Sequence, residues 1–244
     1  MLCWLYSMTI DLELPRDINS IKLSEWQKFS KLVDDNKDST NDFLEIKMLE
    51  IFAGLKYKDI HTLPVGTFSE AIEYLNILFE SKTPLIRRFN MTGTDGATVE
   101  FGFIPNLDKI TMGEYIDLNN YLDDPATLHK AMAVLFRPIH PSYNEKESYR
   151  ISSYEGSDFF SEIMKDMPLG IALGAKVFFY RLGIKLSKAI LNSITVIPEE
   201  QEQLSEEERK LLTENIAGIK NCTLLLEDKL LGLTKPHLSQ FMKQ

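Results

Sequence analysis

The feature that most constrains the fold of this 244-residue chain is an internal repeat. Three blocks of the first half recur in the second half in the same order. Within each of the first two blocks, the difference in residue number between the aligned positions is constant. Repeats of this kind indicate duplicated supersecondary units, which bury their apolar faces against each other. The alternative is a chance alignment of two helical stretches of similar composition. The aligned blocks are residues 18–32 with 107–121, 44–52 with 128–136, and 63–78 with 167–182.

Each copy is predicted to form three helices, and the start of the first helix carries the clearest signal. In the second copy, Thr111 and Glu114 have the spacing of a capping box, in which a hydroxyl and a carboxylate bind the free backbone N–H groups of a helix start. The helix is expected to span residues 112–122. Glu25 takes the position of Glu114 in the first copy, so capping explains both glutamates without catalysis.

Prolines and glycines mark the other helix boundaries. Pro125 suits the first turn of a helix, where its missing N–H costs nothing. Residues 126–136 have apolar side chains at helical spacing, and Pro138 and Pro141 are expected to end that helix. A third helix in each copy is predicted to begin at a Pro-Gly pair, Pro64 and Gly66 in the first copy and Pro168 and Gly170 in the second.

Between the copies, residues 84–105 alternate in polarity around a turn-rich centre, which predicts a β-hairpin. Residues 9–14 are the expected third strand and residues 148–152 a fourth. The fold class is therefore predicted as mainly α, with tandem three-helix modules, a small antiparallel sheet between them and a C-terminal amphipathic helix. The predicted divisions are 1–83, with 1–8 as an upstream-start extension, 84–105, 106–186 and 187–244.

A long insertion separates the second and third helices of the second copy. Residues 137–163 are rich in proline and tyrosine and poor in aliphatic side chains, so we expect a loop. Loops of this length are often functional, and the tyrosines Tyr143, Tyr149 and Tyr154 suit a protein contact surface. The alternative is an ordered surface segment with no function.

The last fifty residues contain a heptad pattern on an amphipathic helix. Three heptads are marginal for an independent coiled coil. Packing of this helix onto the protein's own body is one expectation, and docking on another chain, including a second copy, is the other. We call these apolar positions the seam: Leu212, Ile216, Ile219, Thr223, Leu226, Leu230 and Leu233.

Composition excludes several classes of protein. The net charge of -9 argues against broad binding to a nucleic-acid backbone, which needs many cationic contacts. Cys3 and Cys222 lie far apart with no neighbouring histidine, which favours reduced thiols. No run of about 18 uncharged apolar residues is present, so no membrane helix is expected.

The sequence holds no recognisable catalytic motif. His61, His129, His140 and His237 lie in different elements without zinc-site spacing, so neither a metal nor a cofactor is expected. Asp34, Asp35 and Asp123, Asp124 follow the first helix at matched places in the two copies, which suits helix-terminal loops. A non-enzymatic protein is predicted. The alternative is a small hydrolase or nucleotide-handling enzyme with a scattered site, formed by Asp34, Asp35, His129 and Asp124.

Three stretches of the chain resemble virion-module proteins of tailed bacteriophages that infect Bacteroidetes, including the crAss-like group. They are residues 99–118, 130–138 and 167–175, within a likeness that covers residues 9–186. The resemblance implies a structural or tail-assembly protein, similar to tail assembly chaperones, with no catalytic residues. It also implies that other virion or tail proteins are its partners, and that it works in the host cytoplasm during assembly and in the virion. The seam lies outside the resemblance.

Overall fold

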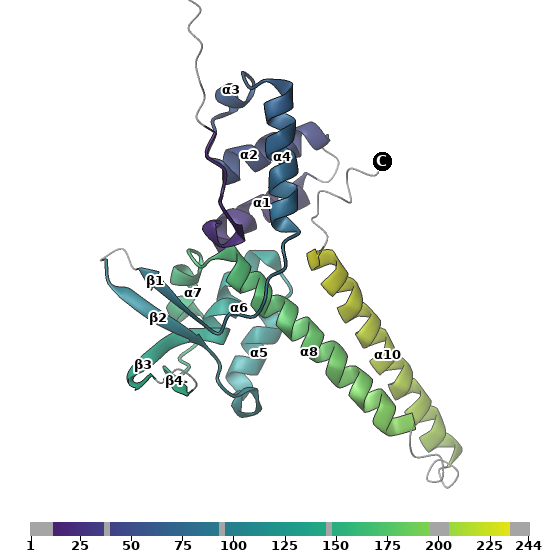
Figure 1. Ribbon diagram of the computed structural model, residues 1–244. Coiled ribbons are helices and arrows are strands. Elements are labelled where there is room, and N and C mark those ends of the chain that lie inside the picture. Colours follow the sequence, from purple (N-terminus) through teal and green to yellow (C-terminus); the bar gives the residue numbers. More distant parts are fainter. Residues whose placement is uncertain (1–11, 37–39, 93–95, 145–147, 196–204, 235–244) are drawn as a thin grey trace, which may run out of the picture.

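The computed structural model describes residues 12–36, 40–92, 96–144, 148–195 and 205–234, apart from the side chains of residues 143, 144, 195 and 234. The fold is mainly helical with one small antiparallel sheet, as predicted. Figure 1 shows three parts: an N-terminal group of helices, a central body that contains the sheet, and a long helical hairpin that projects from the body.

The N-terminal helices pack around a cluster of aromatic rings. Phe52 lies between Phe29 and Phe79, with ring centroids 5.3 and 5.0 Å away. Leu44, Met48 and Leu49 are fully buried beside them, so the second helix packs its apolar face into this core. The elements are η1 (Ile18–Ser20), α1 (Leu23–Asp35), α2 (Asn41–Phe52), α3 (Tyr57–Ile60) and α4 (Val65–Phe79).

The central body packs helices against a four-stranded sheet of order β1-β2-β3-β4, in which all neighbours are antiparallel. Phe103 and Phe136 pair in register, are fully buried, and have ring centroids 5.3 Å apart. The elements are β1 (Arg88–Thr92), β2 (Thr98–Phe103), η2 (Leu107–Lys109), α5 (Met112–Tyr121), η3 (Pro125–Thr127), α6 (Leu128–Leu135), β3 (Phe136–Asn144), β4 (Tyr149–Ile151) and α7 (Asp158–Met164).

The projecting hairpin is formed by α8 (Leu169–Thr195) and α10 (Glu206–Thr234), which pack along each other in opposite directions. The first turns of α8 are buried in the body, where Leu169, Ala172 and Ala175 are inaccessible to solvent. Gly183 allows the two helices to approach, because a Cβ there would lie 2.9 Å from Leu226 Cδ1. Among the described residues, no helix is long and apolar enough to cross a membrane.

Backbone hydrogen bonds join the two predicted copies. Leu23 N donates to Met167 O at 2.8 Å, and Leu169 N donates to Ile21 O at 2.9 Å. The start of the first helix in copy one is thus bound to the start of the last helix in copy two. Aligned blocks do form the same elements, a 3₁₀ turn followed by a helix at Ile18 and Leu107, but the duplication itself stays a prediction.

Two of the strand and loop predictions are wrong. Residues 12–14 form no strand, and residues 9–11 lie outside the described part of the chain. The third strand is instead β3, which begins directly after α6 in the region predicted as a loop. Residues 137–163 therefore hold most of β3, all of β4 and most of α7. β4 confirms the strand predicted at 148–152, and β1 and β2 confirm the hairpin.

The predicted boundary at residue 186 falls inside α8, which runs through it without interruption. The predicted end of the second-copy middle helix was close, since α6 ends at Leu135, but a strand follows it instead of a break. Both differences arise because contacts with residues distant in the sequence, rather than local turn signals, determine where these elements continue.

Candidate functional site

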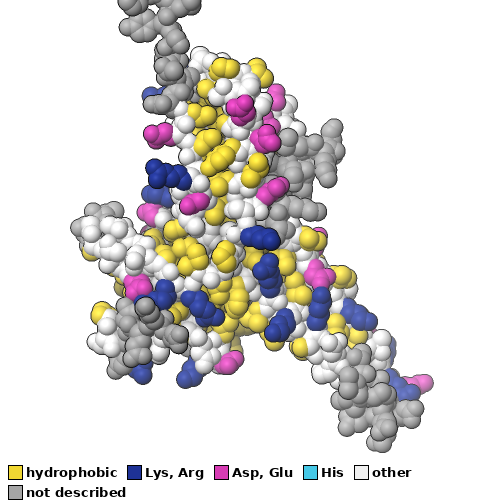
Figure 2. All heavy atoms as spheres, viewed as in Figure 1, with side chains coloured by type: hydrophobic (Ala, Val, Ile, Leu, Met, Phe, Trp, Pro, Cys, Tyr) yellow, Lys and Arg dark blue, Asp and Glu magenta, His cyan; other side chains and the backbone are white. Residues whose placement is uncertain are grey.

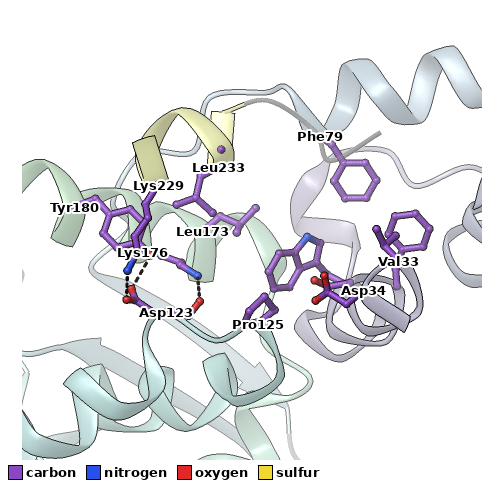
Figure 3. A pocket seen from close by; sticks show the side chains of 14 residues that line it. Val33, Asp34, Phe79, Asp123, Pro125, Leu173, Lys176, Tyr180, Lys229 and Leu233 are labelled. Carbon is purple, nitrogen blue, oxygen red and sulfur yellow. Dashed lines mark hydrogen bonds and ion pairs between the residues drawn. The ribbon is translucent and has the colours of Figure 1, made fainter. Parts of the chain in front are cut away.

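A pocket of about 360 Å³ lies where the N-terminal helices, the central body and the hairpin meet. Its walls come from α1, α4, η3, α8, α10 and the residue that precedes η3 by two positions, Asp123. Side chains of opposite character occupy its two ends (Figure 3). The lining residues are Trp26, Phe29, Ser30, Val33, Asp34, Phe79, Asp123, Pro125, Leu173, Lys176, Tyr180, Lys229, Gly232 and Leu233.

Asp123 organises the polar end of the pocket. The Tyr180 hydroxyl donates to Asp123 Oδ1 at 2.9 Å, and the Lys229 ammonium forms an ion pair with Oδ2. Lys176 Nζ donates to the backbone carbonyl of Asp123 at 3.1 Å. Burial alone would raise the pKa of the Asp123 carboxyl, but the hydrogen bonds from Lys229 and Tyr180, with the charges of Lys229 and Lys176, lower it. The carboxylate therefore stays ionised.

Lys176 is the most perturbed cation of this cluster. Only 3% of the residue is exposed, and burial lowers the pKa of its ammonium to about 8, against the smaller opposing effect of Asp123. Within the described part of the chain it forms no ion pair, and its one hydrogen bond goes to a neutral carbonyl. Burial also raises the pKa of Tyr180, and the adjacent Asp123 carboxylate acts in the same direction.

Most of the remaining pocket wall is apolar. Trp26, Phe29 and Val33 of α1 line it together with Leu173 of α8 and Leu233 of α10. Phe79 of α4 lies at the far side. Asp34 lies at this far side and is exposed. A concave apolar surface with a few convergent polar groups is the usual form of a small-molecule site.

A second polar cluster lies between α5 and β3, and its contacts are accounted for by a structural role. Arg137 and Glu114 form an ion pair with side chains only 7% and 5% exposed, and the Arg137 guanidinium lies over the Tyr154 ring. Glu114 also closes the predicted capping box, since Thr111 N donates to its Oε2 at 2.7 Å. The pair fastens β3 to α5, which is a structural role.

Two of the three predicted contact tyrosines make hydrogen bonds within the molecule. Tyr149 donates to Phe103 O at 2.8 Å and lies beneath Arg88, and Tyr154 donates to Asp117. Both residues are half-buried, and their part in a contact surface stays a prediction. The side chain of Tyr143 lies outside the described residues.

The seam lies on the face of α10 that packs against α8. Thr223 is buried and the six apolar seam residues are half-buried. Leu226 contacts Gly183, and Leu233 and Leu173 line the same pocket. Of the two alternatives for this helix, packing onto the protein's own chain is the one observed.

The residues predicted as structural occupy helix starts. Glu25 accepts a hydrogen bond from Lys22 N at 2.8 Å, and Pro64 precedes the first residue of α4 as Pro168 precedes that of α8. Gly66 has open space around it, whereas a Cβ on Gly170 would lie 2.4 Å from Asn19 Oδ1. The two equivalent glycines therefore differ in how closely the chain packs on them.

The four residues of the alternative scattered site do not form one cluster, and each has its own surroundings. Asp124 binds Ala126 N at 2.8 Å as the cap of η3, His129 Nδ1 lies 3.0 Å from Gln27 Nε2, and Asp35 is exposed. Only Asp34 lines the pocket. In the described part of the chain, no group of three or more His, Cys, Asp or Glu side chains is placed to hold a metal ion.

Sequence reasoning missed the polar cluster of the pocket. Its members come from three elements, and Lys229 is 106 residues from Asp123. One signal was available, because Lys176 interrupts an otherwise apolar run from Leu169 to Tyr180. Comparisons with known proteins add nothing to this site: no family model, no curated protein and no solved structure matches the chain.

Proposed function

We propose that this protein is a non-enzymatic assembly factor that acts through protein–protein contacts made by its projecting hairpin. The observation that carries the proposal is the large apolar side chains that α8 and α10 leave exposed after packing on each other. Leu186, Ile190 and Leu225 are 54%, 47% and 63% exposed. Contiguous exposed apolar surface on a soluble domain is typical of protein interaction sites.

The hairpin has two flanks of different character. Lys188 and Glu227 form an ion pair at 2.7 Å on one flank. Residues two positions apart point to nearly opposite sides of a helix, so Leu186 and Leu225 lie on the other flank. Ile190 follows Leu186 by four residues and the exposed Cys222 precedes Leu225 by three, which places them on the same side. We call Leu186, Ile190, Cys222 and Leu225 the apolar flank.

The flank of the ion pair is basic. Arg181, Lys185 and Lys188 follow at helical spacing and line a shallow groove with Glu227 and Leu230. Figure 2 shows Lys and Arg side chains along the hairpin with hydrophobic side chains between them. Two helices alone bury little of their apolar surface, so a third or fourth helix laid on the apolar flank would complete a bundle.

The resemblance noted in the sequence supplies the setting of the proposal. In that setting the helices laid on the apolar flank belong to other virion or tail proteins, and the contacts form in the host cytoplasm. Support for the setting comes from the sequence stretches at 99–118, 130–138 and 167–175, and support for the mode of action comes from the hairpin.

A sedimentation experiment tests the proposal. Lysates of infected cells are separated by size, and mass spectrometry locates the protein in each fraction. We expect the wild-type chain to migrate with an assembly complex or particle, and a Leu186→Glu/Leu225→Glu variant to migrate as a free protein. Val65→Glu is the matched control, because Val65 is 82% exposed on the N-terminal helices. Recovery of the wild-type chain only as a free protein, and in no fraction that contains a complex or particle, would refute the proposal.

A further inference from the structure

The pocket beside Lys176 has a charged cluster at one end and mostly apolar walls elsewhere, with the exposed Asp34 at its far side. Figure 3 shows Asp123, Lys176, Tyr180 and Lys229 together at one side, Leu173 and Leu233 in the middle, and Phe79 and Val33 at the other. A ligand that fills such a pocket must itself have a polar head and an apolar body. The volume of about 360 Å³ is near the lower end of the usual range for small-molecule sites, ~300–1,000 Å³.

The two lysines at the polar end differ in how they are paired. Lys229 is paired with the Asp123 carboxylate, and Tyr180 donates to the same carboxylate. Lys176 contributes a second positive charge, and only one of its three N–H groups has an acceptor in the described residues, the Asp123 carbonyl. The nearby Asp124 carboxylate is engaged with Ala126 N at 2.8 Å. In the described part of the chain, Lys176 therefore has no ion pair, and two of its N–H groups have no acceptor.

A buried ammonium without an ion pair is costly to the folded protein. Removing a charged group from water is unfavourable unless an opposite charge and hydrogen bonds replace the lost hydration. A bound anion would supply both to Lys176. The favourable counterpart is a single negative charge, because Lys176 is a single ammonium that has no ion pair among the described residues.

We propose that this pocket binds a small amphipathic monocarboxylate, with its carboxylate at Lys176 and its hydrocarbon chain between Trp26, Leu173 and Leu233. The carboxylate accepts the free N–H groups of Lys176, and the apolar chain replaces water along the walls that α1, α8 and α10 provide. The site is separate from the apolar flank of the hairpin and goes beyond the proposed function in assembly.

Titration calorimetry with decanoate, below its micelle concentration, tests the inference on the full chain at pH 7. We expect saturable binding with one site, weakened at least tenfold in Lys176→Met and for decanol, which lacks the charge. Lys185→Met is the matched control, because Lys185 is an exposed lysine of the same helix outside this pocket. The Leu186→Glu/Leu225→Glu variant should bind decanoate as the wild type does, so the two proposals fail independently.

A pH series on the wild-type protein guards against a variant that fails to fold. The groups around Lys176 are Asp123 before η3, Tyr180 on its own helix and Lys229 on α10, with Asp124 farther away and Asp34 of α1 at the far side of the pocket. The ammonium loses its proton above pH 8, so decanoate affinity should fall between pH 7 and pH 9.5 while decanol affinity stays constant. Absence of saturable binding, or equal affinity in the wild type and Lys176→Met, would overturn the inference.

Discussion

Replacement of Lys176 by methionine should stabilise the empty protein at neutral pH. The side chain has an ordinary pKa of 10.5, and its burial lowers this to about 8. Each unit of difference corresponds to about 1.4 kcal/mol, so keeping the ammonium charged in the fold costs roughly 3 kcal/mol at pH 7. Methionine has a similar length and no charge. The lost hydrogen bond to the Asp123 carbonyl offsets about 1 kcal/mol.

The net expectation is a gain of about 2 kcal/mol for Lys176→Met in urea unfolding at pH 7. The sign of the pH dependence follows from the lowered pKa. Between about pH 8 and 10.5 the unfolded lysine binds more protons than the folded one, so wild-type stability rises with pH in this window. The advantage of Lys176→Met should therefore shrink over the same range and be lost at its upper end.

Lys185→Met on the exposed face of α8 provides the control, with an expected change within about 0.5 kcal/mol at either pH. The comparison between variants cancels the titration of other groups, including Tyr180. A lower stability of Lys176→Met at pH 7, or an advantage that does not change with pH, would show that the ammonium is not paying a desolvation cost in this pocket.

Substitutions at three further places test the packing. Leu226→Asp should lower the free energy of unfolding by about 2–4 kcal/mol, since the seam packs on α8; a normal urea midpoint would contradict this. Glu114→Gln should cost about 3–5 kcal/mol by leaving Arg137 buried without a carboxylate, and Glu114→Leu/Arg137→Met should recover much of it. Gly174→Ala should lower the melting temperature, because its Cβ would lie 2.3 Å from a backbone oxygen, whereas Gly218→Ala, with open space around it, should raise it.

Local signals predicted the helix starts well. The capping box of Thr111 and Glu114 is present as the spacing indicated, and α4 and α8 begin directly after Pro64 and Pro168. These signals work because the chemistry of a helix start involves residues three or four positions apart. The same sequence gave no indication that Glu114 would also bind Arg137, which depends on where β3 lies.

The missed strand β3 shows why local signals fail in the central body. Pro138 and Pro141 favour a break, because proline has no N–H to donate to a ladder. Pro138 nevertheless lies opposite Phe101, and its carbonyl accepts from Ser152 N at 2.9 Å. Whether the missing N–H of a proline leaves an acceptor unpaired depends on which strands lie beside it. The local polarity pattern of the sequence does not encode those neighbours.

The pocket illustrates a different limit of prediction. Asp123 looks like an ordinary loop acid, and its helix-terminal position is as expected. Its partners Tyr180 and Lys229 come from α8 and α10, two helices that are distant in sequence from Asp123 and approach each other closely at Gly183. Lys176 is the exception, since one cation in an apolar helical run must either reach water or acquire a counter-charge. Here the fold supplies a carbonyl and a cavity, and the missing counter-charge is what makes this cavity a candidate binding site.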